Sequence, residues 1–511
     1  MEVVIIKEVK TILDFLENTE LEYKNNIAVG DNNSEINYEN LVLNSKKIGT
    51  KIAEYNFKRK PIAIFMRKSY LLPIAMFGVL YSGNFYVILD PESPVKRINN
   101  IIKTLNPEII IYDEDLKEKL NLEKEIEKLE VKDLLNNNIN EEILKEIRKD
   151  IISTDLAYAI FTSGSTGVPK GTVLSNQNVI SYINWFSKTF DINEKTVFGS
   201  QTELYFSMSV SDFFASIFKG ARYQIIPKEY FSFPAKLIDY MNDKKVNTIY
   251  WVPSAYGIIA KFNLFKYAKL KYLEKALFAG EVMPIKYLKY WKSYYSDIMY
   301  ANLFGPTETT DICSYYIVDR EFKDTETLPI GKSCDNLRLY IIDDNKESNK
   351  GELYVSGSFL AKGYYNNLEK TNEVFIQNPL HNNYSEIVYK TGDLVRINKR
   401  GNLEYLGRKD FQIKHMGYRI ELGEIEAVIN SVPNIKQVIC VYDNIKDEII
   451  LFYEGNEIDE EVLTSITREK LPNYMQPNRI IKVDLFECNA NGKIDRKLLK
   501  EKYIKTKEGN K

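Results

Sequence analysis

The chain has 511 residues, of which 44% are hydrophobic and 27% charged, and its formal net charge is −2. This length exceeds the usual size of one hydrophobic core, so it predicts two or more domains. The small net charge gives no reason to expect nucleic acid or a membrane as a partner, and the scattered four cysteines and two histidines argue against a metal cluster.

The N-terminal sequence MEVVIIKEVK lacks the basic region and the long apolar run of a signal peptide. The most apolar region, residues 71–83, is too short to span a bilayer and contains Pro73. The sequence therefore predicts a soluble cytoplasmic protein.

Alternating strand-like and helix-like segments predict an α/β architecture in the larger part of the chain. Buried strands are expected at 61–66 and 108–113, and the charged segment 114–150 is expected to be a solvated helical face. Further strands at 247–253 and 275–282 each end at a polar or small group, which is where open α/β sheets bind ligands.

The segment LAYAIFTSGSTGVPKG, residues 156–171, predicts a buried strand that leads into a loop with few side chains. Backbone N–H groups and hydroxyl groups in such a loop can surround an anion, and glycine permits close approach. It is not the common nucleotide-binding loop, because Lys170 is followed by glycine and Pro169 disfavours a helix at this point. An ordinary solvent-exposed turn is the alternative, but the position directly after a buried strand favours phosphate binding.

The segment NLFGPTETT, residues 302–310, combines an aromatic ring with a rigid Gly-Pro turn. Phe304 offers a flat face for a base, while Thr307 and Glu308 offer a hydroxyl and a carboxylate that suit a phosphate oxygen and Mg²⁺. A turn with a capping threonine is the alternative interpretation.

Two single residues suggest further contacts. Asp393 follows an apolar strand and can accept hydrogen bonds from a ribose diol, or else bond its own backbone in a turn. Lys493 lies in a tight turn before a C-terminal helix, where a lysine alone is more simply a solubilising residue. From about residue 333 the sequence changes to short strands and glycine turns, and the last hundred residues predict a small α+β domain that begins near 406–414.

Ten segments in this order resemble the adenylate-forming (acyl-activating) enzymes, and within them the stand-alone amino-acid adenylation domains, especially the D-alanine–carrier protein ligases. The segments are INYENL, SGNFYVILDPESPVKRI, FTSGSTGVPKG, LFAGEVMP, NLFGPTETT, GELYVSGSFLAKGYY, YKTGDL, YLGRKDFQIKHMGYRIELGEIE, LPNYMQP and NGKIDRK. The resemblance implies a large N-terminal region, residues 1–409, with two α/β subdomains and a β-rich subdomain. It also implies a small mobile α+β C-terminal domain, residues 410–511, with Asp410 at the hinge.

The resemblance assigns an ATP site with a Mg²⁺ ion held by Glu308. Phe304 would stack on adenine, Asp393 would bind ribose, and Lys493 would bridge the substrate carboxylate and the α-phosphate. The implied catalytic residues are Lys493, Thr307 and Glu308. The implied ATP-binding residues are Thr162, Ser163, Gly164, Ser165, Thr166, Gly167, Lys170, Gly280, Glu281, Asn302, Phe304, Asp393 and Arg408.

The implied activity is ATP-dependent conversion of a carboxylic acid to acyl-AMP with release of pyrophosphate. Transfer to the phosphopantetheine thiol of a separate carrier protein would follow, with coenzyme A as the alternative acceptor. The carboxylate is already ionised, so no general base is needed, and Lys493 and Mg²⁺ supply positive charge. A non-catalytic nucleotide-binding homologue is a further alternative, which the presence of Lys493, Glu308, Thr307 and Asp393 disfavours.

The expected substrate pocket departs from this resemblance at two positions. Ser207 stands where amino-acid-activating members have an aspartate that pairs with the α-ammonium, which argues against α-amino acids, D-alanine included. Asp311 is expected to receive an amino or hydroxyl group placed away from the carboxylate, as in a β- or ω-amino acid or a substituted aryl acid. A purely structural hydrogen bond is the alternative for Asp311, and Asp212 could serve in its place. The implied pocket residues are Ser207, Met208, Ser211, Trp251, Leu277, Ala279, Leu303, Asp311 and Ile312.

Overall fold

The structure is a computed structural model that describes residues 9–164, 168–409, 412–444, 446–486, 496 and 499–503. The chain divides into two compact units. The first comprises Met1–Pro91, Thr104–Phe161 and Gly171–Lys409, and the second comprises Glu92–Lys103, Thr162–Lys170 and Asp410–Lys511. Among the described residues, no helix has the length and apolar character needed to cross a membrane.

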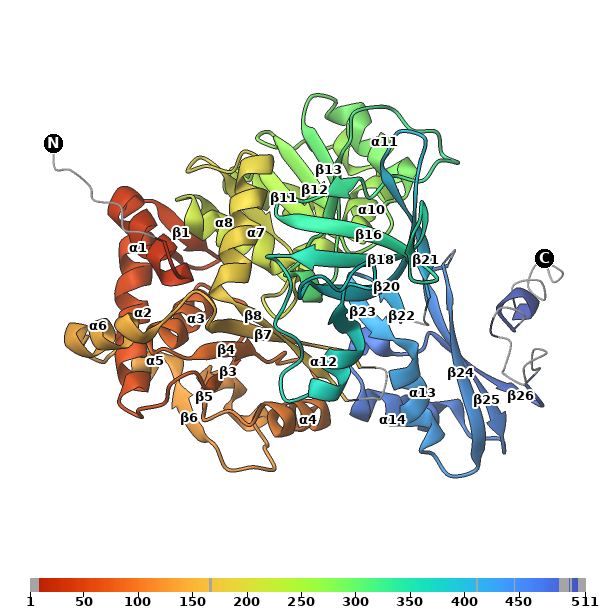
Figure 1. The fold of residues 1–511 in the computed structure, drawn as a ribbon, viewed down its shortest axis with the longest axis horizontal. Helices are drawn as coiled ribbons and strands as arrows, with labels where there is room; N and C mark the ends of the chain where they lie inside the picture. The colour runs from red at the N-terminus through yellow and green to blue at the C-terminus, as the bar shows by residue number, and fades with distance from the viewer. Residues whose placement is uncertain are drawn as a thin grey trace. The chain divides into compact units, whose positions relative to one another are not determined.

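The first unit contains a nine-stranded sheet in the order β15-β14-β13-β12-β11-β9-β10-β1-β2 (Figure 1). Strands β1, β10, β9, β11, β12 and β13 pair in parallel, and the edges are antiparallel. The bounds are β1 Ile27–Gly30, β2 Glu35–Asn37, β9 Val197–Ser200, β10 Arg222–Ile225, β11 Thr248–Trp251, β12 Lys275–Phe278, β13 Met299–Phe304, β14 Ser314–Ile317 and β15 Lys332–Ser333.

A second sheet has the order β6-β5-β3-β4-β7-β8. Its bounds are β3 Pro61–Phe65, β4 Phe85–Ile88, β5 Ile109–Tyr112, β6 Glu127–Glu130, β7 Leu156–Thr162 and β8 Lys170–Ser175. The predicted strands at 61–66 and 108–113 are therefore confirmed. Helices α1 Ile12–Tyr23 and α2 Tyr38–Ala53 precede these strands in the chain, and α3 Leu71–Tyr81 and α4 Val95–Leu105 connect β3 to β4 and β4 to β5. Helix α3 is buried at every position.

The prediction for 114–150 was wrong in part. This segment is not only helical: η1 Glu114–Lys119, α5 Val131–Leu134 and α6 Glu141–Asp150 accompany the strand β6. β6 pairs with β5 at the edge of the sheet, and its four residues EKLE are exposed or half-buried. Charged residues are common on edge strands, where they discourage pairing with other chains, so this composition did not distinguish a solvated helix from an edge strand.

Two layers of helices cover the nine-stranded sheet. The helices of one face are α7 Asn176–Thr189 and α8 Ser209–Phe218, and those of the other are α10 Pro253–Lys261 and α11 Ile285–Tyr294, with α9 Pro234–Asp243 between β10 and β11. On β11 the ring of Tyr250 contacts Phe186 of α7, while the ring of the next residue, Trp251, contacts Tyr256 of α10. Successive side chains of a strand point to opposite faces, so these contacts assign each layer to its face.

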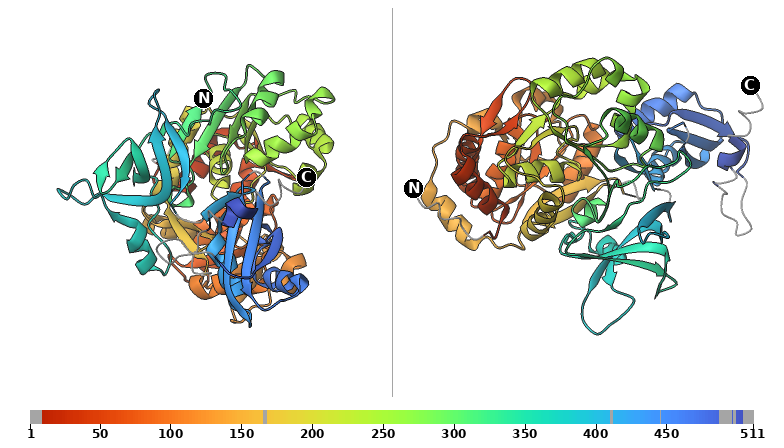
Figure 2. Two further views of the ribbon diagram at one scale, coloured as in Figure 1. Left: turned by 90° about the vertical axis from the view of Figure 1, so that its right-hand side faces the viewer. Right: turned by 90° about the horizontal axis from the view of Figure 1, so that it is seen from above.

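The β-rich part of the first unit is an antiparallel sheet in the order β17-β16-β18-β20-β19, with β21 paired to β20. Its elements are β16 Leu337–Asp343, β17 Lys346–Glu347, β18 Lys350–Gly357, α12 Leu368–Val374, β19 Phe375–Gln377, β20 Ile387–Ile397 and β21 Leu403–Arg408. The strands are drawn in teal in Figure 2. The predicted change to short strands near residue 333 is confirmed.

The second unit is α+β, as predicted for the last hundred residues. Its strands β24, β25 and β26 form one sheet and β22 and β23 form a hairpin. The bounds are β22 Gln412–His415, β23 Tyr418–Glu421, α13 Leu422–Asn430, β24 Ile435–Asp443, β25 Glu448–Gly455, α14 Glu460–Lys470 and β26 Arg479–Val483. Its core contains Ile425, Ile429, Leu451 and Leu463, each fully buried.

Candidate functional site

The C-terminal ends of β12 and β13 carry three of the residues predicted to bind ATP. Gly280 and Glu281 follow β12 after Ala279, and Asn302 lies on β13, one strand further along the sheet. The Glu281 carboxylate accepts hydrogen bonds from the Ser254 N–H at 2.8 Å and the Ser254 hydroxyl at 3.3 Å. Asn302 Nδ2 donates to the Pro329 carbonyl at 2.8 Å. These contacts fix polar side chains at the edge where parallel sheets bind ligands.

Gly305 allows close approach of backbone segments in the turn that follows β13. A Cβ atom at Gly305 would lie 2.3 Å from the Asp311 carbonyl oxygen and 2.7 Å from the Cys313 nitrogen. The Cys313 N–H also donates to the Phe304 carbonyl at 2.8 Å. Residues 304–313 therefore fold back on themselves, with the Phe304 ring 5.6 Å from the ring of Tyr405.

Thr310 adds local strain to this turn. It has φ 71° and ψ −55°, which β-branched residues rarely adopt. The Asp311 N–H donates to the Thr309 carbonyl at 2.9 Å, closing a three-residue γ-turn of the strained kind. The Thr310 hydroxyl donates to the Phe359 carbonyl at 2.7 Å and anchors the turn to its surroundings. Strained residues of this kind cluster at functional sites.

Thr307 and Glu308 are buried in the same turn. Tyr364 donates its hydroxyl to Glu308 Oε1 at 2.6 Å, and the Ala361 N–H donates to the Glu308 carbonyl at 2.9 Å. Thr307 donates its hydroxyl to Ser207 Oγ at 3.1 Å. The structure thus joins a residue predicted at the phosphates to one predicted at the acid substrate.

Asp393 and Arg408 form a buried ion pair across β20 and β21. They face each other in register, and Arg408 Nη1 lies 3.1 Å from Asp393 Oδ1 and donates to the Thr391 carbonyl at 2.9 Å. The Asp393 N–H donates to Thr391 Oγ1 at 3.0 Å. The carboxylate is therefore oriented by Arg408 as well as by the turn.

Asp311 is surrounded by hydroxyl groups. Its Oδ2 atom accepts hydrogen bonds from Ser211 at 2.5 Å, Tyr250 at 3.0 Å and Tyr182 at 3.2 Å, and Tyr182 and Ser211 are themselves 2.6 Å apart. Burial raises the pKa of both tyrosines well above the usual value, and the negative charge of Asp311 raises it further. The two phenols therefore remain protonated and donate their hydrogen atoms to the carboxylate oxygen.

Sequence reasoning assigned Trp251 to the substrate pocket and did not single out Tyr182 or Tyr250, the two tyrosines that donate to Asp311. Trp251 Nε1 donates to the Gly199 carbonyl at 2.7 Å, and alternation along β11 puts its side chain on the opposite face from Tyr250, so Tyr250 rather than Trp251 reaches Asp311. Tyr250 pairs in register with Leu277 of β12, so these two side chains share a face. The alternation of side chains along β11 could have indicated Tyr250 from the sequence. No local pattern in the sequence pointed to Tyr182 in α7.

The remaining predicted pocket residues lie around the same face and turn. Leu277 pairs in register with Ala301, and alternation places Ala279 and Leu303 on the same side of the sheet. Met208 directly precedes α8, and Ile312 directly follows Asp311; both are buried. Ser207, Ser211 and Asp311 are tied to these elements by the hydrogen bonds described above.

The predicted phosphate loop falls in the second unit. Ser163 donates its hydroxyl to the Arg419 carbonyl at 2.7 Å, and Gly164 follows it, between Thr162 at the end of β7 and Lys170 at the start of β8. The predicted residues Ser165, Thr166, Gly167, Asp410 and Lys493 lie outside the described residues.

The Mg²⁺ prediction rests on one carboxylate. Among the described residues, no group of three or more His, Cys, Asp or Glu side chains could hold a metal ion. Mg²⁺ is usually bound through one or two carboxylates together with substrate phosphates and water. The buried, hydrogen-bonded Glu308 fits that mode of binding.

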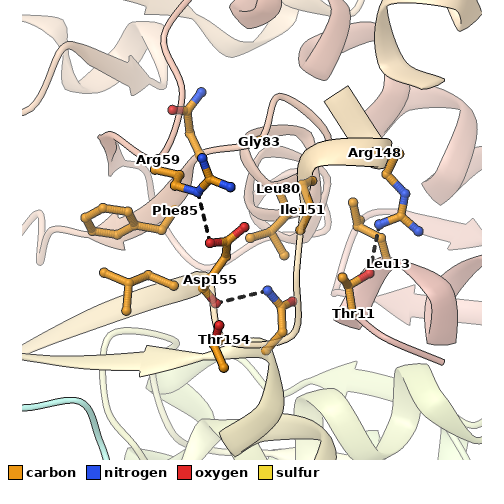
Figure 3. Close-up of a pocket in the computed structure, with 13 residues that line it drawn as sticks. Thr11, Leu13, Arg59, Leu80, Gly83, Phe85, Arg148, Ile151, Thr154 and Asp155 are labelled. Carbon is orange, nitrogen blue, oxygen red and sulfur yellow. Dashed lines mark hydrogen bonds and ion pairs between the residues drawn. The ribbon is translucent and has the colours of Figure 1, made fainter. Parts of the chain in front are cut away.

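A separate polar cavity of about 240 Å³ lies in the first unit, at the N-terminal ends of β4 and β7 (Figure 3). Arg59 Nε donates to Asp155 at 2.9 Å, Arg148 to the Thr11 hydroxyl at 2.8 Å, and Asn176 to the Asp155 carbonyl at 3.1 Å. These groups satisfy one another, and none of the predicted site residues lines the cavity. The cavity therefore gives no indication of a ligand.

Comparisons with known proteins place these features in a family. Residues 16–365 match the family model described as AMP-binding enzyme. Zwittermicin A synthase ZmaJ of Bacillus cereus is 31% identical over 452 residues, covering 86% of this chain and 84% of that protein. Gramicidin S synthase 1 of Brevibacillus brevis and bacitracin synthase 3 of Bacillus licheniformis are each 30% identical, over 96% and 93% of this chain, which spans 44% and 7% of their lengths.

Two solved structures have the same fold. The adenylation domain AlmE of Vibrio cholerae, in complex with glycyl-adenosine-5′-phosphate, has a TM-score of 0.83 at 20% identity and covers 99% of this chain and 100% of its own. PA1221, a nonribosomal peptide synthetase protein containing adenylation and PCP domains, has a TM-score of 0.83 at 18% identity and covers 96% of this chain and 84% of its own. The α/β N-terminal region and the small C-terminal domain are therefore an adenylation-domain fold.

Proposed function

Because the chain belongs to the AMP-binding family of adenylate-forming enzymes, we propose that it uses ATP to convert a carboxylic acid to acyl-AMP. It then transfers the acyl group to the phosphopantetheine thiol of a separate carrier protein. The observation that supports this most strongly is the turn after β13, where Phe304, Thr307, Glu308 and Asp311 lie within eight residues. A base-stacking ring, a phosphate-binding hydroxyl, a metal-binding carboxylate and a substrate-binding group on one rigid turn suit this reaction.

The roles of the residues follow from the charges that the reaction brings together. A substrate carboxylate attacks the α-phosphorus of ATP, the bond to pyrophosphate breaks, and negative charge increases at phosphorus. Lys493 would supply positive charge between the two reactants, Thr307 would donate to the α-phosphate, and Glu308 would hold Mg²⁺, which would supply further positive charge at the phosphates. Asp393, oriented by Arg408, accepts hydrogen bonds from the ribose hydroxyls.

We propose that the acid carries an amino group, or a hydroxyl group, away from its carboxylate and that Asp311 receives it. Three hydroxyl groups donate to one oxygen of the buried Asp311 carboxylate, and donors of this kind favour its charged form. An ammonium group paired with it would avoid the cost of burying an unpaired charge. Ser207, which accepts a hydrogen bond from Thr307, has no charge to offer an α-ammonium. The favoured substrates are β- or ω-amino acids and amino- or hydroxy-substituted aryl acids.

The test is ATP–pyrophosphate exchange with a panel of D- and L-alanine, β-alanine, longer ω-amino acids and hydroxy- and aminobenzoates. We expect the highest kcat/KM for an acid with a distal amino or hydroxyl group, and loss of that preference in Asp311→Ala. A clear preference for D-alanine would contradict the substrate proposal. Absence of exchange with every acid would contradict the activity itself and favour the non-catalytic alternative.

The acceptor is tested separately. Carrier domains joined to adenylation domains in PA1221 and in the NpsA-ThdA fusion support a carrier protein as the partner. The purified enzyme, ATP and the preferred acid are incubated with holo carrier proteins, an apo carrier protein or coenzyme A. We expect a thioester on a holo carrier protein and none on the apo form. Faster formation of acyl-coenzyme A would favour the alternative acceptor.

A further inference from the structure

Lys68 joins the six-stranded and the nine-stranded sheet at the ends of two of their strands. It follows β3 of the six-stranded sheet, and its ammonium group contacts the end of β9 in the nine-stranded sheet. Lys68 Nζ donates to the Thr202 carbonyl at 2.7 Å, to the Ser200 hydroxyl at 3.0 Å and, more weakly, to the Ser200 carbonyl at 3.3 Å. All three acceptor atoms belong to Ser200 and Thr202, so one short segment holds the Lys68 ammonium group in place.

Asp212 lies in the first turn of α8 and is 1% exposed. Its Oδ1 atom accepts a hydrogen bond from the Phe213 N–H at 2.8 Å. Burial raises the pKa of Asp212 to about 7, against the attraction of Lys68 and the influence of the Ser200 hydroxyl, and burial lowers the pKa of Lys68. Each charge thus offsets part of the cost of burying the other.

The connection between β9 and α8 borders the proposed substrate site. Residues 201–208 connect β9 to α8, so Lys68 holds the start of this connection and Asp212 lies just beyond its end. Ser207, within the connection, accepts the hydrogen bond of Thr307 at 3.1 Å. Other charged groups act on the pair as well: Glu203 favours the charged form of Lys68, and Asp311 disfavours that of Asp212.

We propose that Lys68, with its charge partly offset by Asp212, is a positioning residue that fixes the start of the 201–208 connection and so keeps Ser207 and Met208 in place beside the acid substrate. Neither residue is assigned a contact with the substrate. The inference rests on the proposed function, because it assumes that this connection borders the acid. It predicts that loss of the Lys68 ammonium group raises the KM for the acid and leaves the binding of ATP largely intact.

The main test compares Lys68→Met with Lys60→Met in ATP–pyrophosphate exchange with the preferred acid. Lys60 precedes the same strand, but its side chain is 53% exposed and forms a surface ion pair with Glu108 at 3.6 Å, so it is a matched control. We expect Lys68→Met to raise the KM for the acid about tenfold or more, because small displacements of a positioning element are costly. The KM for ATP should change less than about twofold in either variant, and a purely structural loss would lower the active fraction without this split.

A second measurement does not depend on activity. Hydrogen–deuterium exchange of the backbone amides of 201–208 should become faster in Lys68→Met and remain unchanged in Lys60→Met. If Lys68→Met does not fold, Asp212→Asn, which keeps the side-chain shape, should show the same direction of change in both measurements. Unchanged acid KM and unchanged exchange of 201–208 in a folded variant would overturn the inference. A parent enzyme inactive with every acid would instead overturn the proposed function, and hydrogen exchange would still decide the role of Lys68.

Discussion

A buried carboxylate with three hydroxyl donors, as at Asp311, can serve two different ends. The donors can simply satisfy the charge, or they can hold it ready for a cationic substrate group. The two possibilities differ in what happens when one donor is removed. A structural network loses stability, whereas a recognition site also changes its preference among substrates.

Tyr250→Phe removes the donor at 3.0 Å from Asp311 and keeps the ring that contacts Phe186. We expect kcat/KM for the preferred distal-amino acid to fall about tenfold relative to an unsubstituted acid of similar size. The neighbouring Trp251→Phe is the control, because Trp251 lies on the other face of β11. It should lower the melting temperature and leave the order of substrate preference unchanged. Equal effects on all acids by Tyr250→Phe would indicate a structural network.

Lys493→Ala should reduce ATP–pyrophosphate exchange by about 10²–10³-fold or more while the protein stays folded, because it removes charge stabilisation at the reacting atoms. Lys500→Ala is a suitable control: Lys500 bonds Asn444 at the surface at 3.2 Å. Circular dichroism and the melting temperature establish folding. Exchange within a few-fold of the parent would show that Lys493 does not have the proposed role.

At the scale of elements, the turn of residues 304–313 depends on Gly305. A methyl group there would lie 2.3 Å from the Asp311 carbonyl oxygen, so Gly305→Ala must displace backbone rather than a flexible side chain. We expect a loss of about 1–3 kcal/mol in unfolding free energy and near loss of exchange activity. Gly401→Ala is the control, since its Cβ would meet nothing within 4 Å although its φ is +78°. It should cost stability through backbone strain alone and retain activity.

The elements themselves were largely predictable from sequence, because local patterns encode them. Buried strands such as β3 and β5 are short apolar runs bounded by polar residues, and the TETT turn follows a strand and a Gly-Pro pair. The edge strand β6 was missed because its charged residues do not alternate with buried ones. The hydroxyl partners of Asp311 come from α7, α8 and β11, up to 129 residues away in sequence, and only the tertiary fold brings them together.

At the scale of the whole molecule, the two half-reactions make different demands. In the proposed reaction, adenylation would need Lys493 at the reacting atoms and thiol transfer would need that lysine to move away. The family resemblance attributes this movement to rotation of the C-terminal domain at Asp410. Asp410→Pro fixes one backbone angle, so we expect ATP–pyrophosphate exchange near the parental rate and a much slower acylation of the carrier protein. Single-turnover measurements of each half-reaction distinguish the two. An equal loss in both would argue against a hinge at this position.

The γ-turn at Thr310 also limits which changes of sequence this site can accept, in evolution or in redesign. The same few residues that carry Asp311 also carry Thr307 and Glu308, and hydrogen bonds to the Phe359 carbonyl and from the Ala361 N–H anchor them to their surroundings. If Asp311 has the proposed role, a side-chain exchange at position 311 would alter selectivity without changing the length of the turn, so it would be an easy mutational step. An insertion or deletion between 305 and 311 would shift every functional group at once. Diversification at this site should therefore proceed by point substitution within a turn of constant length.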